Sequence, residues 1–124
     1  MKKILSSLLI FMSLGNCALC SESVNVYYFY GSPRCITCKK MEAYTKSAVD
    51  SMKDKNIIYK PINIDEKSNK HFVKKYNLYT KTVILSKVNN GKEASKNLDK
   101  IWLKVKNEKD YKNYIIKEIK EFNK

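Results

Sequence analysis

The stretch VNVYYFYGSPRCITC, residues 24–38, decides how this chain is expected to fold. Its first part, Val24 to Tyr30, is β-branched and aromatic without any charge, which is typical of a strand buried on both faces. Gly31-Ser32-Pro33-Arg34 interrupts that strand. From Cys35 onward, apolar residues recur every three or four positions, which predicts an amphipathic helix. Cys35 and Cys38 therefore mark the first turn of a helix that directly follows a buried strand.

The rest of the chain continues to alternate between strands and helices. We expect strands over residues 57–64, 82–88 and 92–96, a short helix over 65–76 and a terminal helix over 108–122. Asn89-Asn90-Gly91 predicts a hairpin turn, because asparagine and glycine tolerate positive φ angles. Pro61 lacks a backbone N–H, which indicates an edge position for its strand. The connection over residues 97–105 carries Trp102, which we interpret as a core side chain under the terminal helix.

The resulting order of elements, β-α-β-α-β-β-α, defines the expected fold class. Strand–helix–strand units favour parallel crossovers, and the hairpin adds an antiparallel edge. We therefore predict an α/β fold in which a small mixed sheet of about four strands is flanked by helices on both faces. The chain has 124 residues, of which 44% are hydrophobic, and this suits one compact domain over residues 21–124.

Residues 1–20 precede that domain and read as a signal peptide. Lys2 and Lys3 form a positive start, and the apolar run over residues 4–14 (ILSSLLIFMSL) is too short to span a membrane. We expect the protein to be exported, in a bacterium by preference, to the periplasm or the extracytoplasmic face of the membrane.

The point of cleavage is open between alternatives. Cleavage after Cys20 would leave Ser21 as the first residue and two thiols that can pair. Alternatively, Leu14-Gly15-Asn16-Cys17 resembles a lipoprotein box, and a lipid on Cys17 would then anchor the protein to a membrane. The number of cysteines favours simple secretion, because lipidation at Cys17 would leave Cys20 as an unpaired thiol. An uncleaved anchor is the third alternative.

The charge of the chain is strongly positive. Lys and Arg total 25 against 12 Asp and Glu, which gives a formal net charge of +13. The lysines are spread along the chain, and Arg34 is the single arginine, whereas nucleic-acid readers rely on arginine for bidentate contacts. We therefore expect no nucleic-acid partner. The single histidine, His71, is interpreted as a surface residue.

The Cys35-Ile36-Thr37-Cys38 dithiol carries the predicted chemistry. At a helix N-terminus, free backbone N–H groups and the helix dipole stabilise a negative charge, and Arg34 and Lys39 act in the same direction. Cys35 should therefore attack a substrate disulfide as a thiolate, and Cys38, buried one turn further on, should resolve the mixed disulfide. Tyr28 and Tyr30 are candidates to border the pair. No flavin or nicotinamide motif is visible, and we expect no cofactor.

Two other interpretations of the cysteines stay open. A purely structural disulfide would close a very small loop and therefore stabilise the chain little. Metal binding is the sharper alternative, because Cys17-Ala18-Leu19-Cys20 and the second pair form C-x2-C-x14-C-x2-C, close to a zinc-ribbon spacing. In a related version, Cys35 and Cys38 alone would bind a soft metal or metalloid such as zinc or arsenite.

The run over residues 59–93 resembles the central stretch of thioredoxins. Ile62-Asn63-Ile64-Asp65 corresponds to a strand with its acidic end, and Asn90-Gly91 corresponds to the hairpin. The segments YYFYGSPRCITCKKMEAYTKSAV, HFVKKYNLYTKTVIL and KNLDKIW resemble more closely a group of small exported bacterial proteins, often labelled an ArsF-type nitroreductase-subunit family. We carry over no nitroreductase activity from that label.

This resemblance implies a thioredoxin-like fold and a protein-disulfide oxidoreductase that is monomeric. Its partner would be a disulfide-bearing protein substrate or a membrane electron-donor protein. The resemblance also points to Lys81 and Thr82 as supporting residues. Thioredoxins have a cis-proline just before the position of Thr82, where this chain has Lys81, and a trans bond is expected because a non-proline cis bond costs about 3 kcal/mol.

Two further departures concern the surroundings of the dithiol. The first strand, Val24 to Tyr30, lacks the buried acid that thioredoxins use to deprotonate the resolving cysteine, and Arg34 replaces their tryptophan before the dithiol. We therefore expect slow or partner-specific turnover. The same departures favour the alternative in which the thiolates bind a metal or metalloid.

Overall fold

A computed structural model describes residues 23–124, so the predicted leader, with Cys17 and Cys20, lies outside the described residues. The elements are β1 (Val24–Tyr30), α1 (Ile36–Met52), β2 (Ile57–Asn63), the 3-10 turn η2 (Lys67–Asn69), α2 (Lys70–Lys75), β3 (Thr82–Asn89), β4 (Lys92–Asn97), α3 (Ile101–Lys104) and α4 (Glu108–Phe122). This order confirms the predicted β-α-β-α-β-β-α sequence, with α3 inside the predicted connection.

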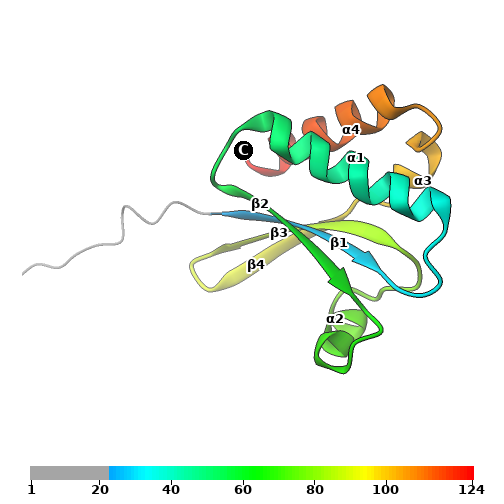
Figure 1. Ribbon diagram of the computed structural model, residues 1–124. Coiled ribbons are helices and arrows are strands. Elements are labelled where there is room, and N and C mark those ends of the chain that lie inside the picture. The colour runs from blue at the N-terminus through cyan, green and yellow to red at the C-terminus, as the bar shows by residue number, and fades with distance from the viewer. Residues whose placement is uncertain (1–22) are drawn as a thin grey trace, which may run out of the picture.

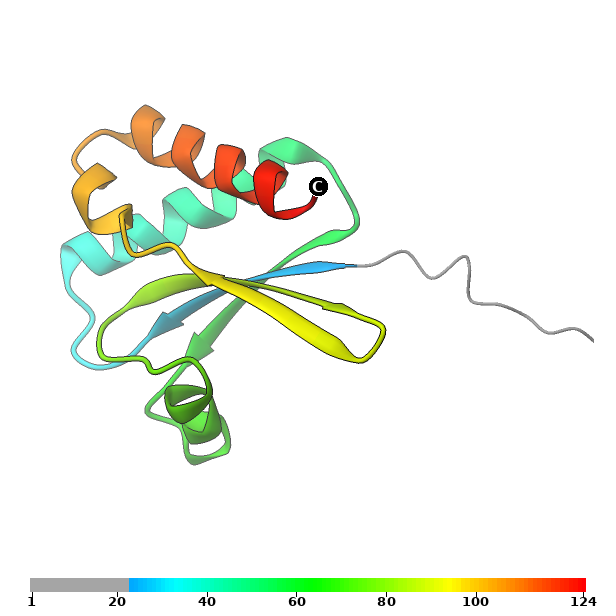
Figure 2. The ribbon, with the colours of Figure 1, turned by 180° about the vertical axis from the view of Figure 1, so that it is seen from behind.

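The four strands form one mixed sheet in the order β2-β1-β3-β4. β1 is parallel to β2 and antiparallel to β3, and β3 is antiparallel to β4. α1, α3 and α4 cover one face of this sheet and α2 covers the other, as both views show (Figures 1 and 2). The predicted α/β fold class, a small mixed sheet of four strands flanked by helices on both faces, is therefore confirmed, and Pro61 lies on the edge strand β2, as expected.

Each face of β1 has its own hydrophobic core, because successive side chains of a strand point to opposite faces. Under α1 and α4, the core includes Val24, Val26, Tyr28, Met41, Ala48, Val83, Leu85, Ile101, Tyr111, Ile115 and Ile119. On the α2 side, the smaller core consists of Phe29, Leu78 and Ile84, against which Phe72 and Tyr76 pack. The prediction that the first strand is buried on both faces is therefore confirmed.

Two local predictions need correction. The helix expected over residues 65–76 is shorter, because the backbone first makes a 3-10 turn and α2 spans only Lys70–Lys75. The side-chain oxygen of Asn63 accepts the N–H of Asp65 at 2.9 Å, which holds the chain in a turn where a regular helix was expected to begin.

Trp102 was expected in the core, and this prediction is wrong. Trp102 is 38% exposed, whereas its neighbour Ile101 is completely buried. α3 has only four residues, and a helix this short directs one side of its single turn to the core. Ile101 occupies that side, so Trp102 and Leu103 lie at the surface.

Within residues 23–124, no helix is both long enough and apolar enough to cross a bilayer.

Candidate active site

The dithiol lies at the start of α1, after the loop that connects β1 to this helix. Cys35 is the N-cap residue of α1 and forms a disulfide with Cys38, with 5.1 Å between their Cα atoms. The backbone N–H of Cys38 donates to the Cys35 sulfur at 3.1 Å. Cys35 is exposed, whereas Cys38 is only 1% exposed. The two sulfurs therefore differ in access, in the way that the sequence predicted.

The loop over residues 31–34, here called the dithiol loop, is hydrogen-bonded to Asp65, two residues after the end of β2. The N–H of Ser32 donates to the Asp65 carboxylate at 2.7 Å, and this bond holds the pKa of Asp65 below its ordinary value. A Cβ atom at Gly31 would come within 3.1 Å of that carboxylate, so glycine permits the close approach. Ser32-Pro33 is a cis peptide. The loop thus connects β1 to α1 in one defined path.

The Arg34 side chain is bound to α1. Its guanidinium pairs with Glu42, one turn beyond Cys38, and lies 4.3 Å from the centre of the Tyr30 ring. Most of its charge is therefore balanced within the protein. Tyr30 therefore contacts the residue that directly precedes Cys35.

Lys39 and Thr82 take different places around the dithiol. Lys39 is exposed on the first turn of α1, and its backbone N–H donates to the Cys35 carbonyl at 3.0 Å. Thr82 is 2% exposed, and its hydroxyl donates to the Asn97 side chain at 2.6 Å, across β3 and β4. Thr82 therefore stabilises the pairing of two strands and makes no contact with the dithiol loop among its described hydrogen bonds.

Lys81 reaches the dithiol loop from the start of β3. Its ammonium group donates to the Pro33 carbonyl at 3.2 Å, and its own carbonyl accepts the indole N–H of Trp102 at 2.9 Å. Ser32-Pro33 is the only cis peptide bond within residues 23–124, so the bonds on both sides of Lys81 are trans, as predicted. Lys81 and Trp102 thus link α3, β3 and the dithiol loop.

Tyr28 lies beneath Cys38. Its hydroxyl donates to the Cys38 carbonyl at 2.9 Å, and burial raises the pKa of Tyr28 to about 12, against an opposing effect of Arg34. A phenol with that pKa stays protonated at neutral pH, so it acts here as a hydrogen-bond donor and not as a base. Sequence reasoning placed Tyr28 near the pair without a role; its inward position on alternate residues of β1 was the signal.

The described part of the chain offers no ready metal centre. Residues 23–124 contain no cluster of three or more His, Cys, Asp or Glu side chains that could hold a metal ion. His71 lies on the surface, as predicted, and its ring contacts Phe72. The zinc-ribbon spacing depends on Cys17 and Cys20, which lie outside the described residues.

Exposed apolar side chains lie between the two cysteines and around the Trp102 end of the Lys81 contact. Ile36, between the two cysteines, is 76% exposed. A hollow of about 520 Å³ is lined by the exposed Tyr79 and Leu103 together with Trp102, whose indole contacts Lys81. A smaller hollow of about 280 Å³ lies between the dithiol loop and residues 78–81. Apolar surface of this kind beside a reactive sulfur can bind a polypeptide substrate.

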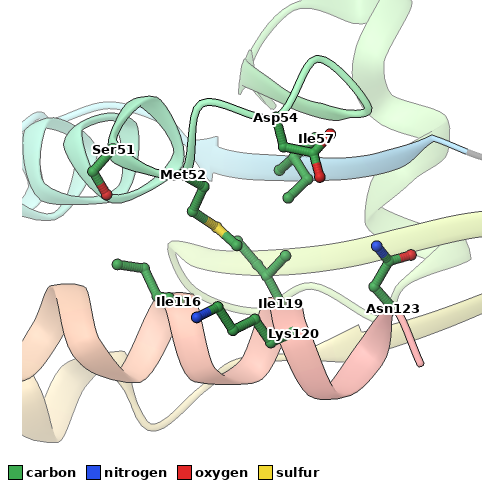
Figure 3. A pocket seen from close by; sticks show the side chains of 8 residues that line it. All are labelled: Ser51, Met52, Asp54, Ile57, Ile116, Ile119, Lys120 and Asn123. Carbon is green, nitrogen blue, oxygen red and sulfur yellow. The ribbon is translucent and has the colours of Figure 1, made fainter.

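Another hollow, of about 540 Å³, lies at the opposite end of α1 (Figure 3). Met52, Ile116 and Ile119 project into it between α1 and α4. α1 has 17 residues and is therefore about 25 Å long, which separates this hollow from the dithiol. It is not part of the candidate active site.

Comparison with known proteins finds similarity to solved structures at low sequence identity. No protein-family model and no curated protein matches the chain. Among solved structures, one described as a malarial protein is 23% identical, with a TM-score of 0.43, covering 60% of this chain and 80% of that one. A Thermus thermophilus thioredoxin is 12% identical, with a TM-score of 0.48 and coverages of 68% and 72%. A Fasciola hepatica thioredoxin is 15% identical, with a TM-score of 0.45 and coverages of 68% and 79%. None of these findings supports the finer resemblance to the ArsF-type group.

Proposed function

We propose that the protein is an extracytoplasmic thiol–disulfide oxidoreductase that works through Cys35 and Cys38. One observation carries the proposal: an exposed cysteine at the N-cap of α1 is joined to a buried cysteine one turn further on. A disulfide that closes so short a loop contributes little to stability, so a structural role does not account for it. Disulfide exchange requires one accessible sulfur and one protected sulfur, and the pair supplies both.

The exchange proceeds in two balanced steps. The Cys35 thiolate attacks one sulfur of a substrate disulfide, forms a mixed disulfide and releases the other substrate sulfur as a thiolate. The Cys38 thiolate then attacks the Cys35 sulfur, which forms the Cys35–Cys38 disulfide and releases the second substrate thiolate. The Cys38 proton passes to solvent or to a released thiolate. Two electrons move from the protein dithiol to the substrate disulfide, and the reverse sequence oxidises a substrate dithiol.

The start of α1 favours the attacking form of Cys35. The Cys38 N–H points at the Cys35 sulfur, and the unpaired N–H groups of the first turn place partial positive charge at the same position. These dipoles are fixed by the helix, so they stabilise the thiolate without further rearrangement. No carboxylate of β1 lies beneath Cys38, and protonated Tyr28 cannot replace one as a base. Slow resolution of the mixed disulfide is the expected consequence.

The place of action and the partners belong to the same proposal. The predicted leader over residues 1–20 supports export, with cleavage after Cys20 or lipidation at Cys17. The substrate would be a disulfide-bearing protein, and a membrane electron-donor protein would return the pair to the dithiol state. The protein would act as a monomer.

The test is to titrate the pair in glutathione buffers of defined ratio and to count alkylated thiols by mass spectrometry. In the full chain, Cys17 and Cys20 are replaced by serine, so that only Cys35 and Cys38 remain. We expect one reversible two-electron couple, and Cys38→Ser should trap mixed disulfides with partner proteins. Cys35→Ser is the matched control and should trap far fewer, because its remaining sulfur is buried.

The same preparation distinguishes the alternative function. If the pair does not cycle between dithiol and disulfide, or if this preparation is purified with zinc or titrates arsenite stoichiometrically, the proposal is wrong. The dithiol would then be a thiolate module for a soft metal or metalloid.

A further inference from the structure

The ammonium group of Lys81 lies on the rim of the dithiol. We propose that Lys81 is a specificity-determining residue that makes the dithiol selective for disulfides flanked by carboxylates. This inference rests on the proposed oxidoreductase function and names the chemistry of its substrates.

The position of Lys81 is fixed from two sides. Its carbonyl accepts the Trp102 indole N–H at 2.9 Å, which anchors its backbone to α3. Its side chain then crosses to the dithiol loop and donates to the Pro33 carbonyl at 3.2 Å, two residues before Cys35. A lysine side chain normally loses much conformational freedom when it binds a charged ligand, and here the hydrogen bond to Pro33 has already restricted it.

The ammonium group has unused hydrogen-bonding capacity. A lysine carries three N–H donors, and the described hydrogen bonds of Lys81 use one of them, on the neutral Pro33 carbonyl. Asp65 attracts Lys81 electrostatically, but that carboxylate also accepts the Ser32 N–H and is attracted to Lys70. Its negative charge is therefore shared among several groups, and Lys81 can still donate to an incoming carboxylate.

The charges around the dithiol have an excess of cations. Arg34 is balanced by its ion pair with Glu42. Lys39 and Lys40 are exposed on the first turn of α1. Lys39 and Lys40 follow the dithiol on α1, and Lys81 reaches the carbonyl of Pro33 just before it, whereas the carboxylate that faces Lys81 is Asp65. A negatively charged disulfide should therefore approach faster than a neutral or a positive one.

The test compares three small disulfides that differ in charge. Glutathione disulfide is anionic, 2-hydroxyethyl disulfide is neutral and cystamine is cationic. The full chain with Cys17 and Cys20 replaced by serine is reduced, and its second-order rate constant with each probe is measured. All three probes react with the same thiolate, so the ratio of two rate constants cancels any change in the reactivity of Cys35 itself.

Three variants give the readout. Lys81→Met removes the charge and keeps the length of the side chain, and it should lower the ratio of glutathione disulfide to neutral probe by about fivefold. Lys81→Arg should keep the ratio of the parent protein, because arginine is also a cationic hydrogen-bond donor. Lys92→Met removes the same charge from the β3–β4 hairpin and should leave the ratio unchanged. Raising the salt concentration should lower the ratio of the parent protein toward that of Lys81→Met.

The outcomes separate this inference from the proposed function. If the parent protein exchanges with all three probes but Lys81→Met keeps the parent ratio, the specificity role of Lys81 is overturned and the oxidoreductase function stands. The same holds if Lys92→Met lowers the ratio as much as Lys81→Met, because net charge alone would then explain it. If the parent protein reacts with none of the probes, both proposals fall.

Discussion

At the scale of single residues, the two cysteines of the dithiol differ in their exposure to solvent. Cys35 caps a helix and meets solvent, whereas Cys38 faces the core one turn later. The helix that carries the two sulfurs thus places one at the surface and the other in the core. Two predictions belong to this scale.

The first prediction concerns alkylation of the reduced pair. At neutral pH, iodoacetamide should modify Cys35 about tenfold or more faster than Cys38, because only Cys35 is exposed and lies at the positive end of α1. Peptide mapping after a short pulse measures both rates. Equal labelling of the two cysteines would contradict the assignment of roles.

The second prediction concerns Tyr28. Tyr28→Phe removes the hydroxyl that donates to the Cys38 carbonyl and should lower the free energy of unfolding by about 1 kcal/mol. Urea denaturation measures this change, with Tyr79→Phe as the control, because Tyr79 is 81% exposed. The thiol–disulfide equilibrium should stay close to that of the parent protein, since the hydrogen bond of the Tyr28 hydroxyl goes to the backbone carbonyl of Cys38. A large change in that equilibrium would show that Tyr28 has a direct role in the chemistry.

At the scale of elements, α2 is fastened to the sheet by a polar cluster around Glu93 on β4. The Glu93 carboxylate accepts hydrogen bonds from Tyr76 and Ser86, each at 2.5 Å, and pairs with Lys75 at 2.9 Å. Burial alone would raise the pKa of Glu93, but these three partners outweigh it and hold the pKa below its ordinary value. The cluster therefore connects α2 with β3 and β4.

A pH-dependent contribution to stability follows from that shift. Because the pKa of Glu93 is lower in the folded state, its contribution is complete above the ordinary glutamate pKa and is lost as the pH falls through the folded value. Glu93→Gln should cost about 1 kcal/mol at pH 7 and less in acid. Urea unfolding at both pH values measures this, with the exposed Glu66→Gln as control. A difference between parent and Glu93→Gln that does not depend on pH would contradict the prediction.

At the scale of the whole molecule, the core under α1 and α4 contains two buried phenols, Tyr28 and Tyr111, and the partly buried Tyr59 and Tyr114 pack against it. Burial raises the pKa of Tyr28 and of Tyr114 to about 12, and it raises that of Tyr59 and of Tyr111 further. The hydroxyl of Tyr111 lies 2.8 Å from that of Thr45, which joins α4 to α1 inside the core. Neutral phenols are therefore part of what holds the layers together.

This core predicts an alkaline unfolding transition. A tyrosine whose pKa is higher in the folded state than its ordinary 10.0 stabilises the fold fully below pH 10, and the contribution is lost as the pH rises toward 12. Phenolate absorbance and circular dichroism should therefore change together in that range. Tyr111→Phe should reduce the steepness of the transition. Titration of all tyrosines near pH 10 with the fold intact would contradict the prediction.

The local pattern of residues was enough to predict most elements and the place of the dithiol. The uncharged β-branched run of β1, the three-to-four residue spacing of α1 and the Asn90-Gly91 turn each depend on neighbours a few positions apart. Such periodicity reports which side of an element is buried. Burial of Cys38 followed from the same spacing, because it shares the inner face of α1 with Met41 and Thr45.

The contacts that surround the dithiol depended on the fold instead. Lys81 and Pro33 are 48 residues apart, and Trp102 and Lys81 are 21 apart. No periodicity connects such positions, since they meet only after β3 pairs with β1 and α3 folds back over the end of the sheet. The short α3 likewise decided that Ile101 enters the core and that Trp102 stays at the surface. Local spacing thus determines which sulfurs form the pair, whereas the packing of distant segments determines which charges and rings a substrate of that pair would meet.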